Sequence, residues 1–246
     1  MKEKLKAYLC KEKAELKSGI TTAEYVWWWT LRLCMIGMII YNVLREREQM
    51  VIFIMCANFL LTFIIPLMRL VFFKKIFLGK LPYRIQSFID VFIFAGSFLG
   101  HGLDYNGTVP DYDKLMHFIS GGLAVFIGYL IMQSVRGGKE LSPALKTIGA
   151  GGFSCVVIVV WEIFEFFSDF IIDGSANQNW MYEPDGTFVF YRIFGMGAGK
   201  TEQYTVLDTD LDIFVAAVGA CLCMAILYAL LKRKERVFAR LQKTTG

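Results

Sequence analysis

The sequence predicts an all-α fold, a polytopic bundle of membrane-spanning helices. Hydrophobic residues make up 56% of the 246 residues, the mean hydropathy is +0.49, and only five residues are prolines. Soluble domains are less apolar than this, and a helix that crosses a bilayer needs about 20 consecutive, mainly apolar residues. Six stretches approach that length, at residues 26–44, 50–73, 88–103, 115–132, 148–167 and 213–231. We therefore expect six transmembrane helices.

The third of these stretches is the least apolar, because it is short and carries Asp90 and His101. We include it because the neighbouring helices need a crossing here to keep their basic flanks on one side of the membrane. Asp90 falls at about the depth of Arg32 on the first helix and Arg69 on the second. A buried acid among buried arginines favours a structural ion pair within the membrane.

Lysine and arginine are distributed unequally between the two sides of the predicted helices. Nineteen of the 26 lie in residues 1–24, between stretches two and three, between stretches four and five, and after residue 231. The opposite side carries only Arg45, Arg47, Arg192 and Lys200. Because basic residues collect on the cytoplasmic side, we place both termini in the cytoplasm and the protein in a bacterial inner membrane. The net charge of +4 follows from these flanks, so no nucleic-acid partner is expected.

This topology divides the chain into three regions. Residues 1–24 form a basic, amphipathic cytoplasmic segment, residues 25–232 the six-helix membrane domain, and residues 233–246 a basic cytoplasmic tail. The first segment suits either a helix lying on an anionic inner leaflet or a solvated helix. The core helices fall within residues 87–232, and an external loop spans residues 172–207. Inside that loop, residues 180–190 favour a hairpin that forms a flap on the extracytoplasmic side.

Ionisable residues gather at the extracytoplasmic ends of four predicted helices. Such a residue inside a membrane span is costly and therefore indicates a functional site. Nine of them converge on one side of the bilayer: His101, Asp104, Asp113, His117, Glu162, Glu165, Asp169, Asp208 and Asp212. The sequence thus predicts a polar site on that side of the membrane.

Helical spacing brings these residues onto shared faces. Asp113 and His117 are four residues apart, as are Asp208 and Asp212, so each pair lies one turn apart on one side of its helix. With a rise of about 1.5 Å per residue, His117 lies one turn below Asp113, and Glu165 lies one turn below Asp169 on the antiparallel neighbouring helix. Glu165 and His117 can therefore meet at the same depth. Spacings of three or four residues also place Glu162 and Asp169 on the same helix face as Glu165, and they place His101 on the same face as Asp104.

So many carboxylates cannot all be ionised in a pocket of low dielectric constant unless a positive charge joins them. A divalent cation is the simplest partner, and mixed imidazole and carboxylate ligands suit zinc, manganese or iron, whereas a carboxylate-rich subset suits magnesium or calcium. The predicted metal ligands are Asp113, His117, Glu165 and Asp212. Glu162 is the candidate general base that activates a bound water.

Depth separates these residues into two kinds. Asp113 and Asp208 stand where an acidic residue caps a helix, so for these two alone a structural role is the preferred interpretation. His117, Glu162 and Glu165 lie deeper, where capping is not possible and lipid exposure is expensive. For them a functional role is preferred.

One series of motifs resembles a known family. It comprises Asp113-Lys114-Leu115-Met116-His117-Phe118 with Gly121, Trp161-Glu162 with Glu165-Phe166, and Asp208-Thr209 with Asp212 and Gly219-Ala220. Across residues 85–231 these motifs resemble the YjdF-like family of uncharacterised bacterial inner-membrane proteins. A weaker similarity extends to VanZ-like proteins, which share an Asp-Lys-x-x-His-Phe start and are associated with resistance to glycopeptides and antimicrobial peptides. The resemblance implies a membrane protein and supplies no reaction.

Three functions fit these observations. The first is a divalent-metal-dependent hydrolase or transferase acting on an amphiphilic or lipid-linked substrate in the outer leaflet. The second is a cation- or proton-coupled transporter, and the third is a membrane binding or immunity module without catalysis. Below Glu162 the inner halves of the fourth to sixth helices are mostly apolar, so no polar path to the cytoplasm is evident. The enzyme is therefore preferred, with membrane lipids and an amphiphilic ligand as its partners.

Overall fold

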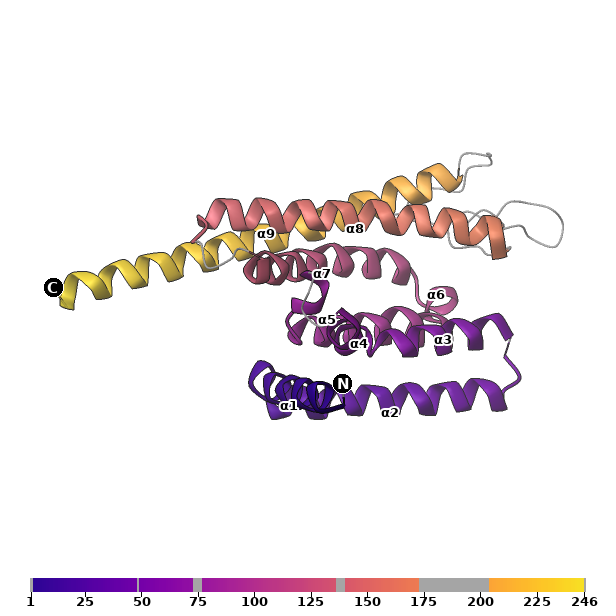
Figure 1. Ribbon diagram of the computed structural model, residues 1–246. Coiled ribbons are helices and arrows are strands. Elements are labelled where there is room, and N and C mark those ends of the chain that lie inside the picture. Colours follow the sequence, from indigo (N-terminus) through magenta and orange to yellow (C-terminus); the bar gives the residue numbers. More distant parts are fainter. Residues whose placement is uncertain (1, 48, 73–76, 136–139, 173–203, 246) are drawn as a thin grey trace. The chain divides into compact units, whose positions relative to one another are not determined.

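The computed structural model describes residues 2–47, 49–72, 77–135, 140–172 and 204–245. These residues form helices and connecting turns, without a strand among them, so the predicted all-α class is confirmed. The chain divides into two compact units, residues 1–110 with 130–139 and residues 111–129 with 140–246. Figure 1 labels the α-helices of both units.

The first unit contains α1 (Lys2–Gly19), α2 (Thr22–Leu44), α3 (Gln49–Leu61), α4 (Ile64–Phe72), η1 (Phe77–Lys80), α5 (Arg84–Ile93), η2 (Phe94–Gly102) and α6 (Tyr105–Thr108). Helix α2 begins with a capping box, in which Thr21 and Glu24 each accept a hydrogen bond from the other's backbone N–H. A buried apolar core joins α2, α3, α5 and η2 through Leu31, Met35, Met55, Ile93 and Phe98.

The helix predicted at residues 50–73 is broken into α3 and α4, which are bent by 53°. Pro66 has no N–H to donate to the carbonyl of Thr62 four residues earlier, and the guanidinium of Arg32 donates to that carbonyl instead. The Gln86 side chain accepts a hydrogen bond from the N–H of Ile65 at 2.9 Å. Buried polar side chains therefore satisfy the backbone groups that the break exposes.

The stretch predicted as the third span is continuous but changes its helix type, because α5 passes directly into η2, which is a π-helix. Asp90 on α5 is fully buried and lies 3.3 Å from Arg32, and it accepts a hydrogen bond from Gln86 at 2.6 Å. Arg69, which the sequence groups with this pair, instead lies 2.9 Å from Glu12 of α1. The structure thus joins Arg69 to the N-terminal helix rather than to Asp90.

Helix α1 covers most of the predicted segment 1–24 and is held to its unit by a buried network. Glu12, only 4% exposed, accepts hydrogen bonds from Arg69 at 2.9 Å and from the Tyr83 hydroxyl at 2.8 Å. Arg69 also donates to Glu15 at 2.5 Å, and the Tyr8 hydroxyl donates to the Arg69 carbonyl at 2.6 Å. These contacts hold α1 against α4 and the start of α5.

The second unit is built from most of α7 (Tyr112–Val135) together with α8 (Pro143–Ile172) and α9 (Tyr204–Thr245). Helices α8 and α9 lie side by side (Figure 1). A Cβ atom at Gly121 of α7 would collide with the Ala216 carbonyl of α9, and one at Gly219 of α9 with the Phe118 carbonyl of α7. Ser154 of α8 donates a hydrogen bond to the Gly121 carbonyl at 2.8 Å. Glycine therefore permits backbone contact between α7 and α9, as is common in membrane bundles.

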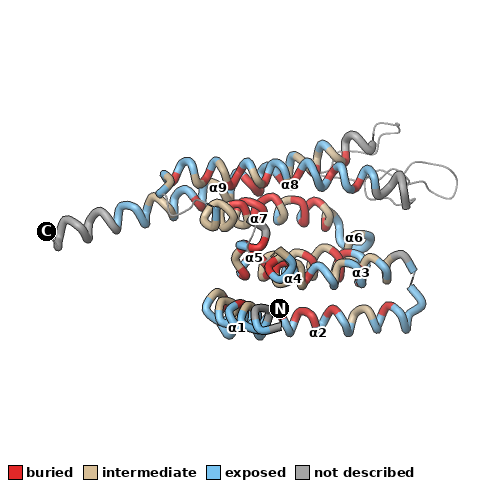
Figure 2. The backbone as a smooth tube through the Cα atoms, viewed as in Figure 1, coloured by how far each residue is buried: buried red, intermediate tan, exposed pale blue. Residues whose placement is uncertain are grey.

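Four helices are long and apolar enough to cross a membrane: Thr22–Leu44, Tyr112–Val135, Pro143–Phe167 and Asp208–Val237. The bent pair Val51–Leu61 and Ile64–Phe72 makes a fifth if it is one crossing. Exposed residues recur along α8 and α9 (Figure 2), and they include large apolar side chains such as Val156 and Phe164. Exposed apolar faces of this length are typical of membrane-integrated helices. The part of the chain that the structure describes thus contains four or five candidate crossings, and the sixth predicted crossing is not confirmed.

Candidate functional site

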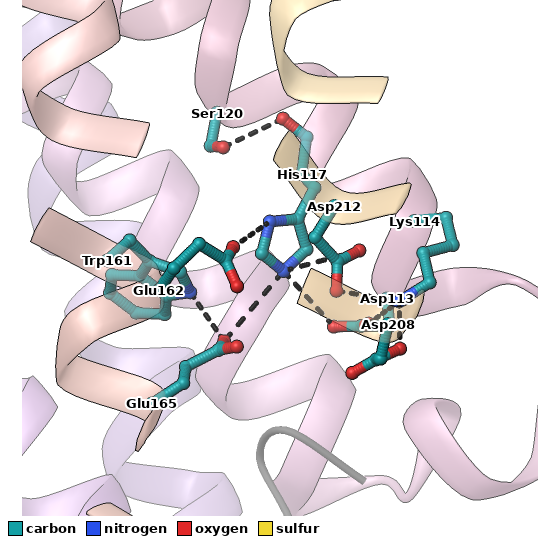
Figure 3. A network of polar contacts seen from close by, with 9 residues as sticks. All are labelled: Asp113, Lys114, His117, Ser120, Trp161, Glu162, Glu165, Asp208 and Asp212. Atoms are coloured by element: carbon teal, nitrogen blue, oxygen red, sulfur yellow. Dashed lines mark hydrogen bonds and ion pairs between the residues drawn. The ribbon is translucent and has the colours of Figure 1, made fainter. Parts of the chain in front are cut away.

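Seven ionisable side chains of the second unit meet between its three helices (Figure 3). We call them the polar cluster: Asp113, Lys114 and His117 of α7, Glu162 and Glu165 of α8, and Asp208 and Asp212 of α9. Six of the seven are buried, and the side chain of Asp113 is 26% exposed. On each helix the members include a pair three or four residues apart, which places that pair on one face near one end of the helix.

The two imidazole nitrogens of His117 face different carboxylates. Its Nε2 atom lies 3.6 Å from Asp113 Oδ1, 3.8 Å from Glu165 Oε1 and 3.8 Å from Asp212 Oδ1. Its Nδ1 atom lies 3.5 Å from Glu162 Oε1. One nitrogen therefore faces oxygens from all three helices, while the other faces a single carboxylate (Figure 3).

Lys114 supplies a positive charge to the other half of the polar cluster. Its ammonium donates to Asp113 Oδ2 at 3.0 Å, to Asp208 Oδ1 at 2.5 Å and to Asp212 Oδ2 at 2.7 Å. An ammonium has three N–H donors, so these three bonds use its whole capacity. Lys114 therefore holds three carboxylates together and has no donor left for a ligand.

Four buried carboxylate oxygens of the polar cluster have no hydrogen-bond partner: both oxygens of Glu162, Oδ2 of Asp208 and Oδ1 of Asp212. Buried polar atoms are normally satisfied, because leaving one unpaired costs free energy. Oδ1 of Asp212 is also one of the oxygens that face Nε2 of His117. These acceptors provide places for a cation or for added protons.

The polar cluster carries more negative than positive charge. Its five carboxylates face one ammonium and one imidazole, so ionisation of all the acids leaves a negative excess whether or not His117 is protonated. Carboxylates this close together in a buried site favour a further cation or proton uptake.

Two sets of residues place one possible ligand atom each within 4.8 Å of the others: His117 with Glu162, Glu165 and Asp212, and Asp113 with Asp208 and Asp212. Lys114 donates to all three members of the second set. Because an ammonium already bonds to every member of that set, the oxygens around His117 are the better candidates for holding a metal ion.

Some residues assigned to the site from the sequence lie elsewhere in the structure. His101 of η2 and Asp104, which precedes α6, belong to the first unit, where Asp104 lies 3.9 Å from Arg47. Asp169 belongs to α8, but its side chain lies outside the described residues. The hairpin expected at residues 180–190 also lies outside them.

Sequence reasoning assigned no role to Lys114 or Trp161. Lys114 could have been recognised from its position directly after Asp113, at the start of an apolar run. A lysine buried there needs acidic partners for its ammonium. Trp161 precedes Glu165 by one helical turn and donates from Nε1 to Glu165 Oε1 at 2.6 Å. The four-residue spacing is the available signal for this second contact.

The comparison with known proteins supports the interpretation that the chain is a membrane protein. No curated protein and no solved structure matches the chain. Similarity to VanZ-like proteins is not shown, whereas the resemblance to the YjdF-like family is consistent with the family profile that matches. That profile, a family of predicted membrane proteins (DUF2238), covers residues 27–233 and so includes the whole polar cluster. The chain therefore belongs to the DUF2238 family of predicted membrane proteins.

Proposed function

We propose that this protein is a divalent-metal-dependent hydrolase or transferase that acts on an amphiphilic or lipid-linked substrate. The observation that carries the proposal is the position of His117 Nε2, which faces carboxylate oxygens from α7, α8 and α9. An imidazole nitrogen combined with carboxylates is a ligand set that suits zinc, manganese or iron. The proposed ligands are Asp113, His117, Glu165 and Asp212.

The distances around Nε2 support this assignment. Metal–ligand bonds of about 2.1 Å in a tetrahedral site place neighbouring ligand atoms about 3.4 Å apart. The three oxygens lie 3.6, 3.8 and 3.8 Å from Nε2, which is close to that separation. His117, Glu165 and Asp212 each offer a ligand atom within 4.8 Å of the others, and Asp113 adjoins this set through its 3.6 Å approach to Nε2. A bound dication also compensates the negative excess of the polar cluster.

Glu162 approaches the imidazole from its other nitrogen. A carboxylate next to Nδ1 fixes the orientation of a metal-binding histidine and increases its basicity, and Glu162 Oε1 lies 3.5 Å from Nδ1. Glu162 also offers an oxygen within 4.8 Å of ligand atoms of Glu165 and Asp212. We assign Glu162 as the general base, because its buried oxygens have no hydrogen-bond partner to compete for a proton. A bound dication would supply Lewis acidity and make a water molecule easier to deprotonate.

Lys114 has a positioning role in this scheme. It holds Oδ2 of Asp113 and Oδ2 of Asp212, which leaves Oδ1 of each aspartate on the side of His117. Since its three donors are already used, Lys114 orients two ligands rather than binding substrate.

The proposed topology has six crossings, with both termini in the cytoplasm of a bacterial inner membrane. The unequal distribution of basic residues supports it, and α5 with η2 forms one uninterrupted helical run from Arg84 to Gly102 that supplies the additional crossing. In this topology the polar cluster lies toward the outer leaflet. A substrate with an apolar anchor and a polar, reactive group at the membrane surface fits that depth.

Metal content tests the proposal most directly. Full-length protein is purified in detergent, washed identically for each variant, and measured by inductively coupled plasma mass spectrometry before and after addition of zinc, manganese or magnesium. We expect near-stoichiometric metal in the wild type and its loss in His117→Ala and Glu165→Ala. Asp208→Asn is the matched control, because Asp208 is a buried acid of the same cluster that bonds to Lys114 and does not face Nε2.

Retention of metal in Asp208→Asn together with its loss in the other two variants supports the assigned ligands. Absence of metal from the wild type under every condition would overturn the proposal and leave Lys114 and a protonated His117 as the cations of the polar cluster. Loaded wild type is then assayed for hydrolysis of lipid-linked phosphate esters, with Glu162→Gln expected to keep the metal and lose the activity.

A cation- or proton-coupled transporter is the second candidate, and the break between α3 and α4 is the observation that favours it. Discontinuous membrane helices often line transport sites, and this break is accompanied by the buried pair Arg32 and Asp90. Flux measurements in proteoliposomes separate the two functions, because only a transporter moves an ion across a sealed bilayer. The same measurement with Asp90→Asn identifies whether this pair takes part.

A further inference from the structure

A cavity of about 290 Å³ lies in the first unit, next to the C-terminal end of α2 and the end of η2. It is lined by Tyr41, Asn42, Arg45, Arg47, Gly102, Leu103 and Asp104. None of these residues belongs to the polar cluster. Its size is close to the lower limit for small-molecule sites, about 300 Å³, and suits a ligand of few atoms.

Two arginines border the cavity, and the way α2 ends fixes their positions. Glu46 adopts a left-handed backbone conformation with φ of 54°, and the N–H groups of Glu46 and Arg47 bond to the carbonyls of Val43 and Asn42. This Schellman arrangement places Arg45 and Arg47 on either side of the turn. The Arg45 guanidinium donates to the Tyr41 hydroxyl at 3.1 Å and pairs with no carboxylate among the described residues. Arg45 is therefore a cation available to an anionic ligand.

Asn42 is the buried polar residue of the cavity. It is 0% exposed, and its side-chain Nδ2 donates to the Met38 carbonyl at 2.9 Å. Its Oδ1 is buried and has no hydrogen-bond partner. An unpaired buried acceptor costs free energy, and a ligand that brings a donor to this oxygen recovers it.

The contact between Arg47 and Asp104 is loose. The two charged groups are 3.9 Å apart, and their side chains are 42% and 52% exposed. Exposed pairs at this separation contribute little to stability, about 0–1 kcal/mol, so a bound anion can readily take the place of Asp104 beside Arg47. The cavity thus combines guanidinium groups for an anion with Asn42 Oδ1 and the Asp104 carboxylate for a donor.

We propose that this cavity binds a phosphate ester whose alcohol part carries an N–H or O–H donor, such as a phosphoethanolamine group. The phosphate lies against Arg45 and Arg47, because guanidinium groups bind phosphate oxygens through paired hydrogen bonds. The ammonium group donates to Asn42 Oδ1 and lies near Asp104. The group comes either from a phosphatidylethanolamine lipid or from a free phosphate ester. This site is independent of the metal proposed at His117.

Binding to purified full-length protein in detergent tests the proposal by isothermal titration calorimetry. The probes are O-phosphoethanolamine, O-phosphocholine and inorganic phosphate. O-phosphoethanolamine is expected to bind most tightly. O-phosphocholine has the same phosphate but no N–H donor, so it is expected to bind about tenfold more weakly because Asn42 Oδ1 remains unpaired. Equal binding of these two esters would remove Asn42 from the proposed site.

Paired variants test the arginines. Arg45→Gln combined with Arg47→Gln is expected to weaken O-phosphoethanolamine binding at least tenfold. Arg233→Gln combined with Arg236→Gln is the control, because these two exposed arginines lie on α9 in the other unit. Unchanged binding in the Arg45 and Arg47 variant, or no binding of any probe to the wild type, would overturn the proposal.

Native mass spectrometry from nanodiscs distinguishes the two sources of the phosphate ester. If the source is the lipid, wild-type protein retains phosphatidylethanolamine and the Arg45 and Arg47 variant does not. If the source is a free ester, both retain lipid equally while only the wild type binds O-phosphoethanolamine. Either result supports the proposed chemistry, and the circular dichroism spectrum of each variant verifies that it is folded.

Discussion

Lys114 and Asp212 are joined by a hydrogen bond of 2.7 Å that engages only one of the two carboxylate oxygens. The other oxygen, Oδ1, is buried without a hydrogen bond and lies 3.8 Å from His117 Nε2. Asp113 is arranged in the same way, with Oδ2 on Lys114 and Oδ1 at 3.6 Å from Nε2. Both aspartates therefore stand between a fully bonded ammonium and an imidazole, and the ammonium determines which oxygen faces the ring.

Replacing Lys114 with methionine is expected to destabilise the protein strongly. The change keeps an unbranched side chain that is one atom shorter, but it leaves three carboxylates without their shared cation. Removing one partner of a buried ion pair typically costs about 3–5 kcal/mol. Thermal unfolding of the detergent-solubilised protein, followed by intrinsic fluorescence, measures the effect.

The double variant Lys114→Met with Asp208→Asn separates charge from packing. It removes one of the unpaired acids and is expected to recover part of the lost stability. Lys232→Met is the control, since that lysine forms only a partly exposed pair with Glu235 and a change of at most about 1 kcal/mol is expected. If the double variant is no more stable than Lys114→Met, unpaired negative charge is not the cause of the loss.

Much of the polar cluster follows from helical periodicity. Residues three and four apart lie on one face of a helix, so the amino-acid sequence alone places Asp113 beside His117 and Glu162 beside Glu165. The cation beside Asp113 could not be derived in this way. Lys114 is adjacent to Asp113 in sequence, and its long flexible side chain allows its ammonium to reach acids on another helix.

The break between α3 and α4 shows a different limit of the sequence. An apolar run of 24 residues predicts one straight helix, although Pro66 within it removes a backbone donor. The loss is tolerated because Arg32 and Gln86, on two other helices, provide the missing hydrogen bonds. Such compensation depends on tertiary contacts, which hydropathy does not reveal.

Gly121→Ala is expected to disturb the packing of α7 against α9. The added Cβ would meet the backbone carbonyl of Ala216, which cannot move without separating the helices. Overpacking of this kind costs about 1–3 kcal/mol. Gly152→Ala is the matched control, because a Cβ there meets nothing within 4 Å, and alanine in a helix interior is more favourable than glycine by about 0.5–1 kcal/mol. Equal melting temperatures for the two variants would contradict the close approach at Gly121.

Gln86→Met is expected to weaken the bend between α3 and α4. The variant loses the acceptor for the Ile65 N–H and the donor to Asp90, and each buried group left unpaired costs about 1–3 kcal/mol. Gln133→Met, at a partly buried position of α7, is the control. Hydrogen exchange at the start of α4 reports the effect locally, and the proposed role of Gln86 is wrong if exchange of the Ile65 amide is no faster in Gln86→Met than in the control.

Tyr83 is expected to ionise at unusually high pH. Burial and the hydrogen bond to Glu12 raise the pKa of Tyr83 from 10.0 to about 12. Because the folded protein favours the neutral hydroxyl, the stability linked to this group is present below about pH 10 and is lost as the pH rises toward 12.

Absorbance at the tyrosinate band measures ionisation, and the difference between wild type and Tyr83→Phe isolates this residue from the other ten tyrosines. Glu12→Gln removes the neighbouring negative charge and is expected to shift the difference curve to lower pH. A midpoint near pH 10 in the wild type would show that Glu12 does not hold Tyr83 in its neutral form, and that α1 is not attached to the first unit through this contact.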